Sequence, residues 1–307
     1  MNFYPPPPII QAEIYIRIPD SLRRTGQQTE WRPGSANPAS DILLEGPIYV
    51  SNGDLYLVDV PYGRTLKPNE LVVREDGCIV VADYKLVQYN SPLQLASYNE
   101  LQLLTTPLQH GLLLFDPSTN KISPLLNYRN LERFKGPNDL IVSFTNDIYF
   151  TDQGQTGMSD PTGCVYRLSA TGKLDCLIPN GVFPNGLVLS PDERFLYVDM
   201  TRSNAVWRLQ LHADGTTSKV GLFFQTFACA GPDGLAVDEE GNLFVCHPSL
   251  ASVFVVEKEG VPKARIVSAP DGGRNLTNCT FGGPDGKTCS VRWPCRRVPS
   301  SKMANVN

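Results

Sequence analysis

The sequence predicts an all-β protein, a six-bladed β-propeller whose first, second and last blades are irregular. Three observations support this prediction. Glycine (25) and proline (26) are frequent among the 307 residues, which is typical of a chain with many turns and few long helices. A segment of about 47 residues recurs along the chain. Each copy contains two short apolar runs, rich in β-branched and aromatic residues, that a turn motif joins into a hairpin.

The composition excludes several classes of protein. Hydrophobic residues make up 41% and charged residues 19%, as in a globular protein with a core. The formal net charge of −4 and the lack of a long basic run speak against a nucleic-acid partner. No apolar stretch reaches the ~18–20 residues of a membrane span. The chain begins without an apolar signal segment and its eight cysteines are scattered, so we expect reduced thiols and a cytoplasmic location. The oligomeric state is not readable from the sequence.

Six repeats share one order: a turn, a polar Asn, Asp or Glu, an apolar run, a second turn and a second apolar run. They begin at Leu44, Pro68, Pro137, Pro184, Pro232 and Thr277. In the middle repeats two further strands follow, for example at 205–211 and 219–224. Because four strands in about 40–50 residues are typical of a propeller blade, six such repeats account for the chain.

The spacing of the repeats shows where the pattern is disturbed. The first repeat lacks about 22 residues after Gly63, and the second carries a similar excess at 86–109, which has no hairpin pattern. Residues 110–126 then resume as an outer hairpin. Beyond Gly286 the last repeat loses its second-strand pattern. Shifted splice boundaries or a frameshift would explain these departures, and a genuine lid insertion at 86–109 is the alternative.

These observations predict three regions. Residues 1–40 form an N-terminal extension with an outer strand, and its apolar run at 9–18 is expected to add that strand to the last blade. Residues 41–289 form the propeller, with 86–109 as an atypical insertion. Residues 290–307 form an atypical C-terminal tail.

One polar position recurs at the start of the first strand of each repeat. Its six members are Glu45, Asn69, Asn138, Asn185, Asp233 and Asn278. The first strand of a blade is innermost, so these side chains are expected to converge on the central channel. They offer oxygen atoms but no sulfur or imidazole, which favours a hard cation, and we predict Ca²⁺, with Mg²⁺, Mn²⁺ or Zn²⁺ as alternatives. A turn-capping role is the other interpretation, since Asn or Asp before a turn often binds its own backbone.

A second polar position recurs fourteen residues after the first. Its members are Asp59, Asp83, Asp152, Asp199 and His247. This position ends the second strand of each hairpin, so it is expected to return to the same mouth of the channel. Carboxylates and an imidazole beside a Lewis-acidic ion are suited to hydrolysis. The alternative is that these residues only brace neighbouring loops.

Several stretches together resemble the gluconolactonase, regucalcin and senescence-marker-protein family of calcium-dependent lactonases. These stretches lie at 44–47, 136–140, 149–157, 183–198, 231–245 and 278–286, and the resemblance covers roughly residues 40–85 and 110–286. It implies a six-bladed propeller with one divalent metal ion in the channel. It also implies that Glu45, Asn185 and Asp233 bind the metal, that Asn138 contacts substrate or metal, and that Asp233 is the general acid/base.

The expected function is therefore a metal-dependent lactonase, a hydrolase that opens the ring of a small lactone. Asp233, Asp152 and His247 are the candidates for proton transfer, and Asn138 and Asn69 are the candidates for substrate binding. Regucalcin-like relatives carry an arginine where this chain has Gly136, so a lactone less polar than an aldonolactone is an alternative substrate. A catalytically impaired calcium-binding propeller and a strictosidine-synthase-like enzyme of secondary metabolism are the rival interpretations.

Overall fold

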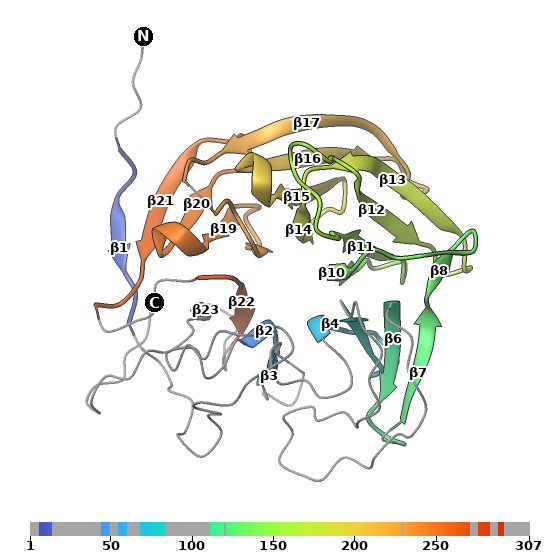
Figure 1. The fold of residues 1–307 in the computed structure, drawn as a ribbon. Helices are drawn as coiled ribbons and strands as arrows, with labels where there is room; N and C mark the ends of the chain where they lie inside the picture. The colour runs from blue at the N-terminus through green and yellow to red at the C-terminus, as the bar shows by residue number, and fades with distance from the viewer. Residues whose placement is uncertain are drawn as a thin grey trace, which may run out of the picture.

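The computed structural model describes residues 6–13, 44–49, 55–59, 68–83, 111–119, 121–228, 230–270, 276–282 and 288–291. The regular structure of these residues is almost entirely β-strand, and the sheets stand around a common centre (Figure 1). The helical elements among them are two 3-10 turns, η2 (Thr201–Ser203) and η3 (Pro248–Leu250). Within the described ranges, no helix has the length and apolar character needed to cross a membrane. The predicted all-β class is confirmed.

The second, third and fourth repeats each form a four-stranded antiparallel sheet in chain order. The second repeat contains β4 (Pro68–Val73), β5 (Ile79–Asp83), β6 (Gly111–Asp116) and β7 (Lys121–Leu126). The third contains β10 (Pro137–Val142), β11 (Ile148–Asp152), β12 (Gly163–Leu168) and β13 (Leu174–Gly181). The fourth contains β14 (Pro184–Leu189), β15 (Phe195–Met200), β16 (Ala205–Leu211) and β17 (Thr217–Gln225). The outer hairpin predicted after the insertion is present as β6 and β7.

The fifth repeat forms a sheet with one additional strand. Its own strands are β18 (Leu235–Val237), β19 (Leu243–His247), β20 (Ser252–Val256) and β21 (Pro262–Val267). The N-terminal β1 (Ile9–Gln11) pairs in parallel with β21, with Ile10 opposite Ile266 (Figure 1). The expectation that this strand joins the last blade is therefore wrong. Backbone hydrogen bonds extend the pairing of β1 with β21 beyond both ends of β1, from Arg265 N to Pro8 O and from Ala12 N to Val267 O.

The first and sixth repeats are each described by one antiparallel hairpin. The first consists of β2 (Leu44–Tyr49) and β3 (Leu55–Asp59), and the sixth of β22 (Cys279–Gly282) and β23 (Thr288–Val291). The expected loss of the second strand beyond Gly286 is wrong, because β23 pairs residue by residue with β22 and crosses the boundary predicted at 289/290. The predicted insertion at 86–109 and the tail from 292 onward lie outside the described residues.

A short hairpin that the sequence analysis does not predict precedes the third sheet. It consists of β8 (Tyr128–Arg129) and β9 (Glu132–Arg133). Its two turn residues, Asn130 and Leu131, have φ angles of 48° and 73°. Two consecutive positive φ angles match the turn geometry that two-residue hairpins favour, although leucine is an unusual residue there.

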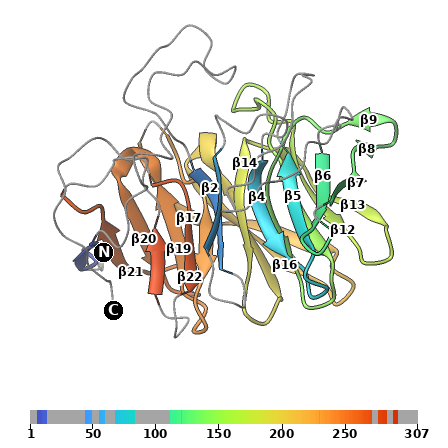
Figure 2. The same cartoon turned by 90° about the horizontal axis from the view of Figure 1, so that it is seen from below.

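The innermost strands form a closed ring. Each contacts the next in the order β2, β4, β10, β14, β18 and β22, and β22 contacts β2 again. Figure 2 shows β2, β4, β14 and β22 running through the middle of the molecule in side view. The number of complete blades stays a prediction, since the described residues include only two strands each of the first and sixth repeats. The ring nevertheless brings the starts of all six repeats to one axis.

Apolar side chains fill the spaces between neighbouring sheets. Between the second and third sheets, for example, Leu112 packs in one cluster with Phe150, and the Phe134 ring meets that of Phe150 edge-on at 5.3 Å. Further clusters join the third to the fourth, the fourth to the fifth, and the fifth to the sixth repeat. Burial of each such side chain contributes roughly 1.5–3 kcal/mol. This packing fixes how the inner strands face one another.

Candidate active site

The predicted ligand residues lie where the inner strands begin. Glu45, Asn138 and Asn185 are buried, with exposed fractions of 7–8%, and Asp233 is half-buried. Asn185 and Asp233 come from neighbouring repeats that are joined directly, because Gly186 N donates a hydrogen bond of 2.8 Å to Asp233 O. Thus the fourth and fifth repeats present adjacent polar residues to the axis.

The second recurring position lies at the same mouth, as predicted. Asp59 pairs with Leu44, Asp83 with Pro68 and Asp152 with Pro137 in the antiparallel register, so each second strand ends beside the start of the first. In the third to fifth repeats the members of this position are deeply buried: Asp152 is 2% exposed, and Asp199 and His247 are fully buried.

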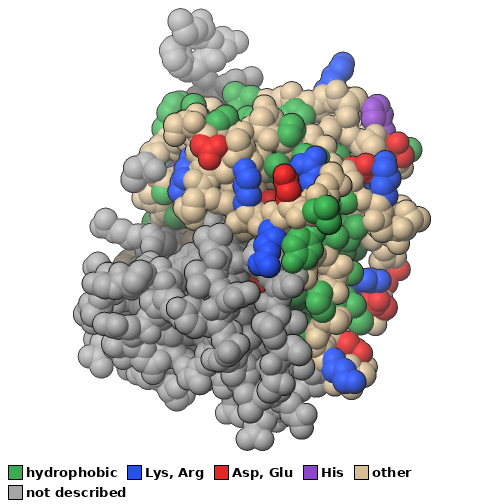
Figure 3. All heavy atoms as spheres, turned by 45° about the vertical axis from the view of Figure 1, so that its right-hand side comes forward, with side chains coloured by type: hydrophobic (Ala, Val, Ile, Leu, Met, Phe, Trp, Pro, Cys, Tyr) green, Lys and Arg blue, Asp and Glu red, His purple; other side chains and the backbone are tan. Residues whose placement is uncertain are grey.

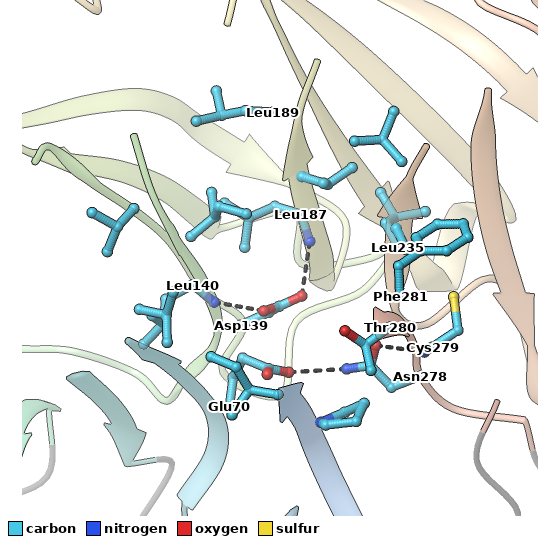
Figure 4. A pocket seen from close by; sticks show the side chains of 18 of the residues that line it. Glu70, Asp139, Leu140, Leu187, Leu189, Leu235, Asn278, Cys279, Thr280 and Phe281 are labelled. Atoms are coloured by element: carbon cyan, nitrogen blue, oxygen red, sulfur yellow. Dashed lines mark hydrogen bonds between the residues drawn. The ribbon is translucent and has the colours of Figure 1, made fainter. Parts of the chain in front are cut away.

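Two acidic residues that sequence analysis missed lie directly beside the first position. In Asp139, Oδ1 accepts a hydrogen bond from Leu140 N (2.6 Å) and Oδ2 accepts one from Leu187 N of the next repeat (2.9 Å). In Glu70, Oε2 accepts one from the Asn278 amide (2.9 Å), as Figure 4 shows. The signal was present in the sequence: the second and third repeats carry an acid where the first, fourth and fifth carry glycine.

Five carboxyl groups from five repeats influence one another electrostatically. Burial first, and then the nearby Glu45, raise the pKa of Asp139 to about 7, although the hydrogen bonds from Leu187 N and Leu140 N act in the opposite direction. The pKa of Glu70 lies well above its ordinary value, because of burial first and then because of Asp139 and Glu45. The pKa of Asp199 is also raised well above its ordinary value by burial, by Asp233 and by Asp139. These mutual shifts show that the carboxyl groups lie close enough to one another to interact.

The structure shifts the predicted alignment of the sixth repeat by one residue. Gly234 N donates to Thr277 O, just as Gly186 N donates to Asp233 O in the preceding repeat. Asn278 Oδ1 accepts from the next backbone N–H, as Asp139 does in the third repeat. Thr277 is therefore the structural equivalent of Asp233, and the expected placement of Asn278 in the first position is wrong. The side chain of Asn69 lies outside what the structure describes.

The chemistry of this centre fits a hard divalent cation. Among the described residues, no three Asp, Glu, His or Cys side chains form a complete metal site, but the predicted set of Glu45, Asn185 and Asp233 includes an amide oxygen. All three offer oxygen, which Ca²⁺ and Mg²⁺ prefer. Asp199 is fully buried, and neither of its carboxylate oxygens has a hydrogen-bond partner within the described part of the chain. A buried carboxylate without a partner is costly, and a cation nearby would offset that cost.

Asp152 has the contacts of a residue that positions backbone. Its Oδ1 accepts a hydrogen bond of 2.7 Å from Gly136 N, two residues before Asn138. Burial raises the pKa of Asp152, and the backbone N–H groups of Lys135 and Gly136 act in the opposite direction. The carboxylate thus holds the segment that leads into Asn138, in line with the bracing interpretation.

His247 is fully buried, and its Nδ1 lies 3.4 Å from Ser249 Oγ. Its Nε2 has no hydrogen-bond partner among the described residues, and its ring meets Phe254 edge-on at 6.0 Å. Burial lowers the pKa of His247 from 6.5 to about 4, and the charge of Arg265 acts in the same direction. The imidazole is therefore neutral near pH 7 and is a weak base.

Replacing His247 with glutamine is expected to flatten the loss of stability in acid. The folded protein keeps the imidazole neutral down to about pH 4, whereas the unfolded chain binds a proton below about 6.5. Stability that is present above pH 6.5 is therefore lost as the pH falls toward 4, by about 2 kcal/mol at pH 5. Thermal melts of both proteins at pH 7.5 and 5 measure this difference. An equal acid-induced shift in both would contradict the assignment.

A cavity of about 410 Å³ lies along the same inner strands. Glu70, Asp139 and Asn278 line one part of it, and leucine side chains of the inner strands line another (Figure 4). The outer surface differs in character: on the face in Figure 3, basic and acidic side chains are interspersed among the described residues. The described lining of this cavity thus contains carboxyl groups but no basic side chain.

Comparisons with known proteins agree with this architecture. A gluconolactonase of Zymomonas mobilis is 29% identical over 292 residues, covering 80% of this chain and 74% of the relative. A gluconolactonase structure from Xanthomonas campestris superposes with a TM-score of 0.64 at 21% identity, covering 89% of this chain and 86% of that one. A calcium-binding regucalcin from Agrobacterium tumefaciens superposes with a TM-score of 0.60 at 19% identity, covering 92% and 86%. The model of the SMP-30/gluconolactonase/LRE-like region matches residues 43–291, and the chain therefore belongs to that family.

Proposed function

We propose that this protein is a divalent-cation-dependent lactonase, a hydrolase that opens the ring of a small lactone. The observation that carries the proposal is the set of oxygen-bearing side chains at the starts of the inner strands, where the buried Glu45 and Asn185 and the half-buried Asp233 belong to three repeats of one closed ring. Membership of the family and the named gluconolactonase relative support this reaction class.

Glu45, Asn185 and Asp233 would hold the cation, for which Ca²⁺ is the first choice. The calcium-binding regucalcin neighbour supports that choice, and Mg²⁺, Mn²⁺ and Zn²⁺ are alternatives. When bound, such an ion polarises an ester carbonyl and stabilises the negative charge that develops on its oxygen.

The chain's own residues would transfer the proton and orient the ester. Asp233 is half-buried, unlike the deeply buried Asp199, so its carboxylate is reachable by water. It accepts a proton from the attacking water and returns it to the leaving alkoxide. The Asn138 amide, on the segment that Asp152 holds, donates a hydrogen bond to the carbonyl oxygen, and Asn69 is a further substrate contact.

The substrate is a small lactone, and Gly136 bears on its polarity. A glycine at this place brings no charge or hydrogen-bonding side chain to the segment before Asn138. A lactone with few hydroxyl groups therefore suits this site better than a sugar lactone. Comparing hydrolysis of a γ-alkyl lactone with that of gluconolactone measures the preference.

Removing the cation is expected to abolish hydrolysis. After treatment with a chelator, turnover of a panel of small lactones should fall to background, and Ca²⁺ should restore it. The melting temperature should rise with Ca²⁺ concentration, since a ligand that binds only the folded state stabilises it by about 2.7 kcal/mol at a hundredfold excess over Kd. Chelator-resistant hydrolysis would refute the cation requirement. A calcium-dependent melt without turnover would favour the impaired calcium-binding propeller.

A further inference from the structure

The cavity along the inner strands extends away from the proposed lactone site. Its lining follows successive residues downstream of the first recurring position, from 70 to 72 and from 139 to 142, and ends at hairpin residues such as Pro191. Asp83, Asp152, Asp199 and His247, which mark the mouth where the strands begin, are not part of the described lining. The cavity therefore begins at Glu70 and Asp139, beside the first recurring position, and extends toward the hairpin turns.

The walls of the cavity are largely hydrocarbon. Leu71, Leu140, Leu187 and Leu235 come from four different inner strands, and Val and Ile side chains continue the lining. A volume of about 410 Å³ lies in the range of small-molecule sites, and apolar walls are typical of such sites. An apolar space of this size is suited to a hydrocarbon group.

The rim of the cavity is held in place by an interaction between two repeats. Phe144, on the hairpin turn of the third repeat, lines the cavity and is 77% exposed. Its backbone N–H donates a hydrogen bond of 2.8 Å to the carboxylate of Glu193, on the hairpin turn of the fourth repeat. An exposed aromatic side chain on a fixed rim offers a contact surface for an entering apolar molecule.

The polar part of the lining is acidic. Glu70 and Asp139 contribute carboxylate oxygens, and the amide of Asn278 already donates to Glu70 (Figure 4). No Lys, Arg or His side chain is present in the described lining, so a bound anion would have no countercharge. Oxygen atoms with remaining lone pairs favour a ligand head group that donates hydrogen bonds and carries positive charge.

We propose that this cavity is a second ligand site, separate from the lactone site, for a small amphiphile with an amine head group. The hydrocarbon body, on the order of ten heavy atoms, lies against the leucine walls, and the ammonium group lies beside Glu70 and Asp139. The described lining contains none of the residues proposed to bind the cation or the lactone, and its carboxyl groups reach that centre only through the electrostatic interaction of Glu70 and Asp139 with Glu45.

Calorimetric titration with three six-carbon probes tests the proposal. Hexylammonium is expected to bind, hexan-1-ol to bind at least tenfold more weakly, and hexanoate to give no measurable binding. Failure of hexylammonium to bind, or equal affinity for hexanoate, would overturn the proposal. Because lactone hydrolysis is assayed separately, either result leaves the proposed function unaffected.

Filling the cavity provides the matched test. Thr280 lines the cavity from β22, and Thr280→Trp is expected to weaken hexylammonium binding at least tenfold while lactone turnover is unchanged. Thr217→Trp, on the outer strand β17, is the control and should leave binding intact. If Thr280→Trp fails to fold by circular dichroism, Glu70→Gln takes its place and should remove the preference for the amine over the alcohol. Unchanged binding in a folded Thr280→Trp protein, or an unchanged preference in Glu70→Gln, would overturn the assignment.

Discussion

Asp233→Ala is expected to abolish both cation binding and lactone hydrolysis. The substitution removes one of the two carboxylates that would hold the cation, and it removes the group that accepts the proton from water. Loss of these two roles should lower kcat/KM by at least about 10³-fold. Calorimetric titration with Ca²⁺ and initial rates on the lactone panel measure the two effects. Asp233→Asn, which keeps the shape of the side chain, should lose turnover as well.

A carboxylate in the same repeat provides the control. Asp238 binds only its own turn, accepting hydrogen bonds from Asn242 N (2.8 Å) and Glu240 N (3.1 Å). Asp238→Ala is therefore expected to cost about 1 kcal/mol of stability and to leave Ca²⁺ affinity unchanged. Full activity in Asp233→Ala would exclude the proposed role of this residue.

Gly186→Ala is expected to separate the fourth and fifth repeats at the axis. A Cβ atom on residue 186 would overlap Asp233 O and would lie 2.8 Å from Gly234 Cα. These are backbone atoms, so relief requires the two inner strands to move apart and the hydrogen bond from Gly186 N to Asp233 O to lengthen. We expect a loss of about 3 kcal/mol in stability and a weakened affinity for Ca²⁺, because Asn185 and Asp233 are displaced together.

Gly221→Ala separates this effect from the general cost of replacing a glycine. Gly221 lies on the outer strand β17, where an added Cβ meets no atom within 4 Å. The melting temperature and Ca²⁺ affinity of the Gly221→Ala protein should match those of the unsubstituted protein. Wild-type values of both quantities in Gly186→Ala would show that the two strands tolerate a wider spacing.

The sequence predicts most of the fold because the repeats carry local information. Hairpins such as β10–β11 follow from apolar runs and turn residues, and four-stranded sheets follow from the repeat length. The place of β1 was not predictable in this way. Its short apolar run specifies a strand but not a partner, and pairing with β21 depends on which edge is open in three dimensions. The two-residue turn Asn130-Leu131 likewise carries leucine where the Asn-Gly pattern that signals such a turn has glycine.

The candidate site, like the fold, could be predicted from the sequence only in part. The recurrence of polar residues predicts that Glu45, Asn185 and Asp233 approach the axis, and the closed order of inner strands agrees with it. The contributions of Glu70 and Asp139 depend on hydrogen bonds between repeats, such as that from Leu187 N to Asp139 Oδ2, which no single repeat contains. The shift from Asn278 to Thr277 has the same origin, since only contacts with a neighbouring repeat fix the register there.

The strand that the N-terminus adds to the fifth sheet has a consequence for handling the protein. An uncovered outer strand displays a row of free N–H and C=O groups that can recruit another chain and lead to aggregation. β1 covers β21 along Arg265–Val267 and so shields that row from intermolecular pairing. A shortened form that retains residues 6–13 keeps β1 in place. A form that begins after Gln11 leaves the backbone N–H and C=O groups of Arg265–Val267 open to pairing with another chain, although the channel is unchanged.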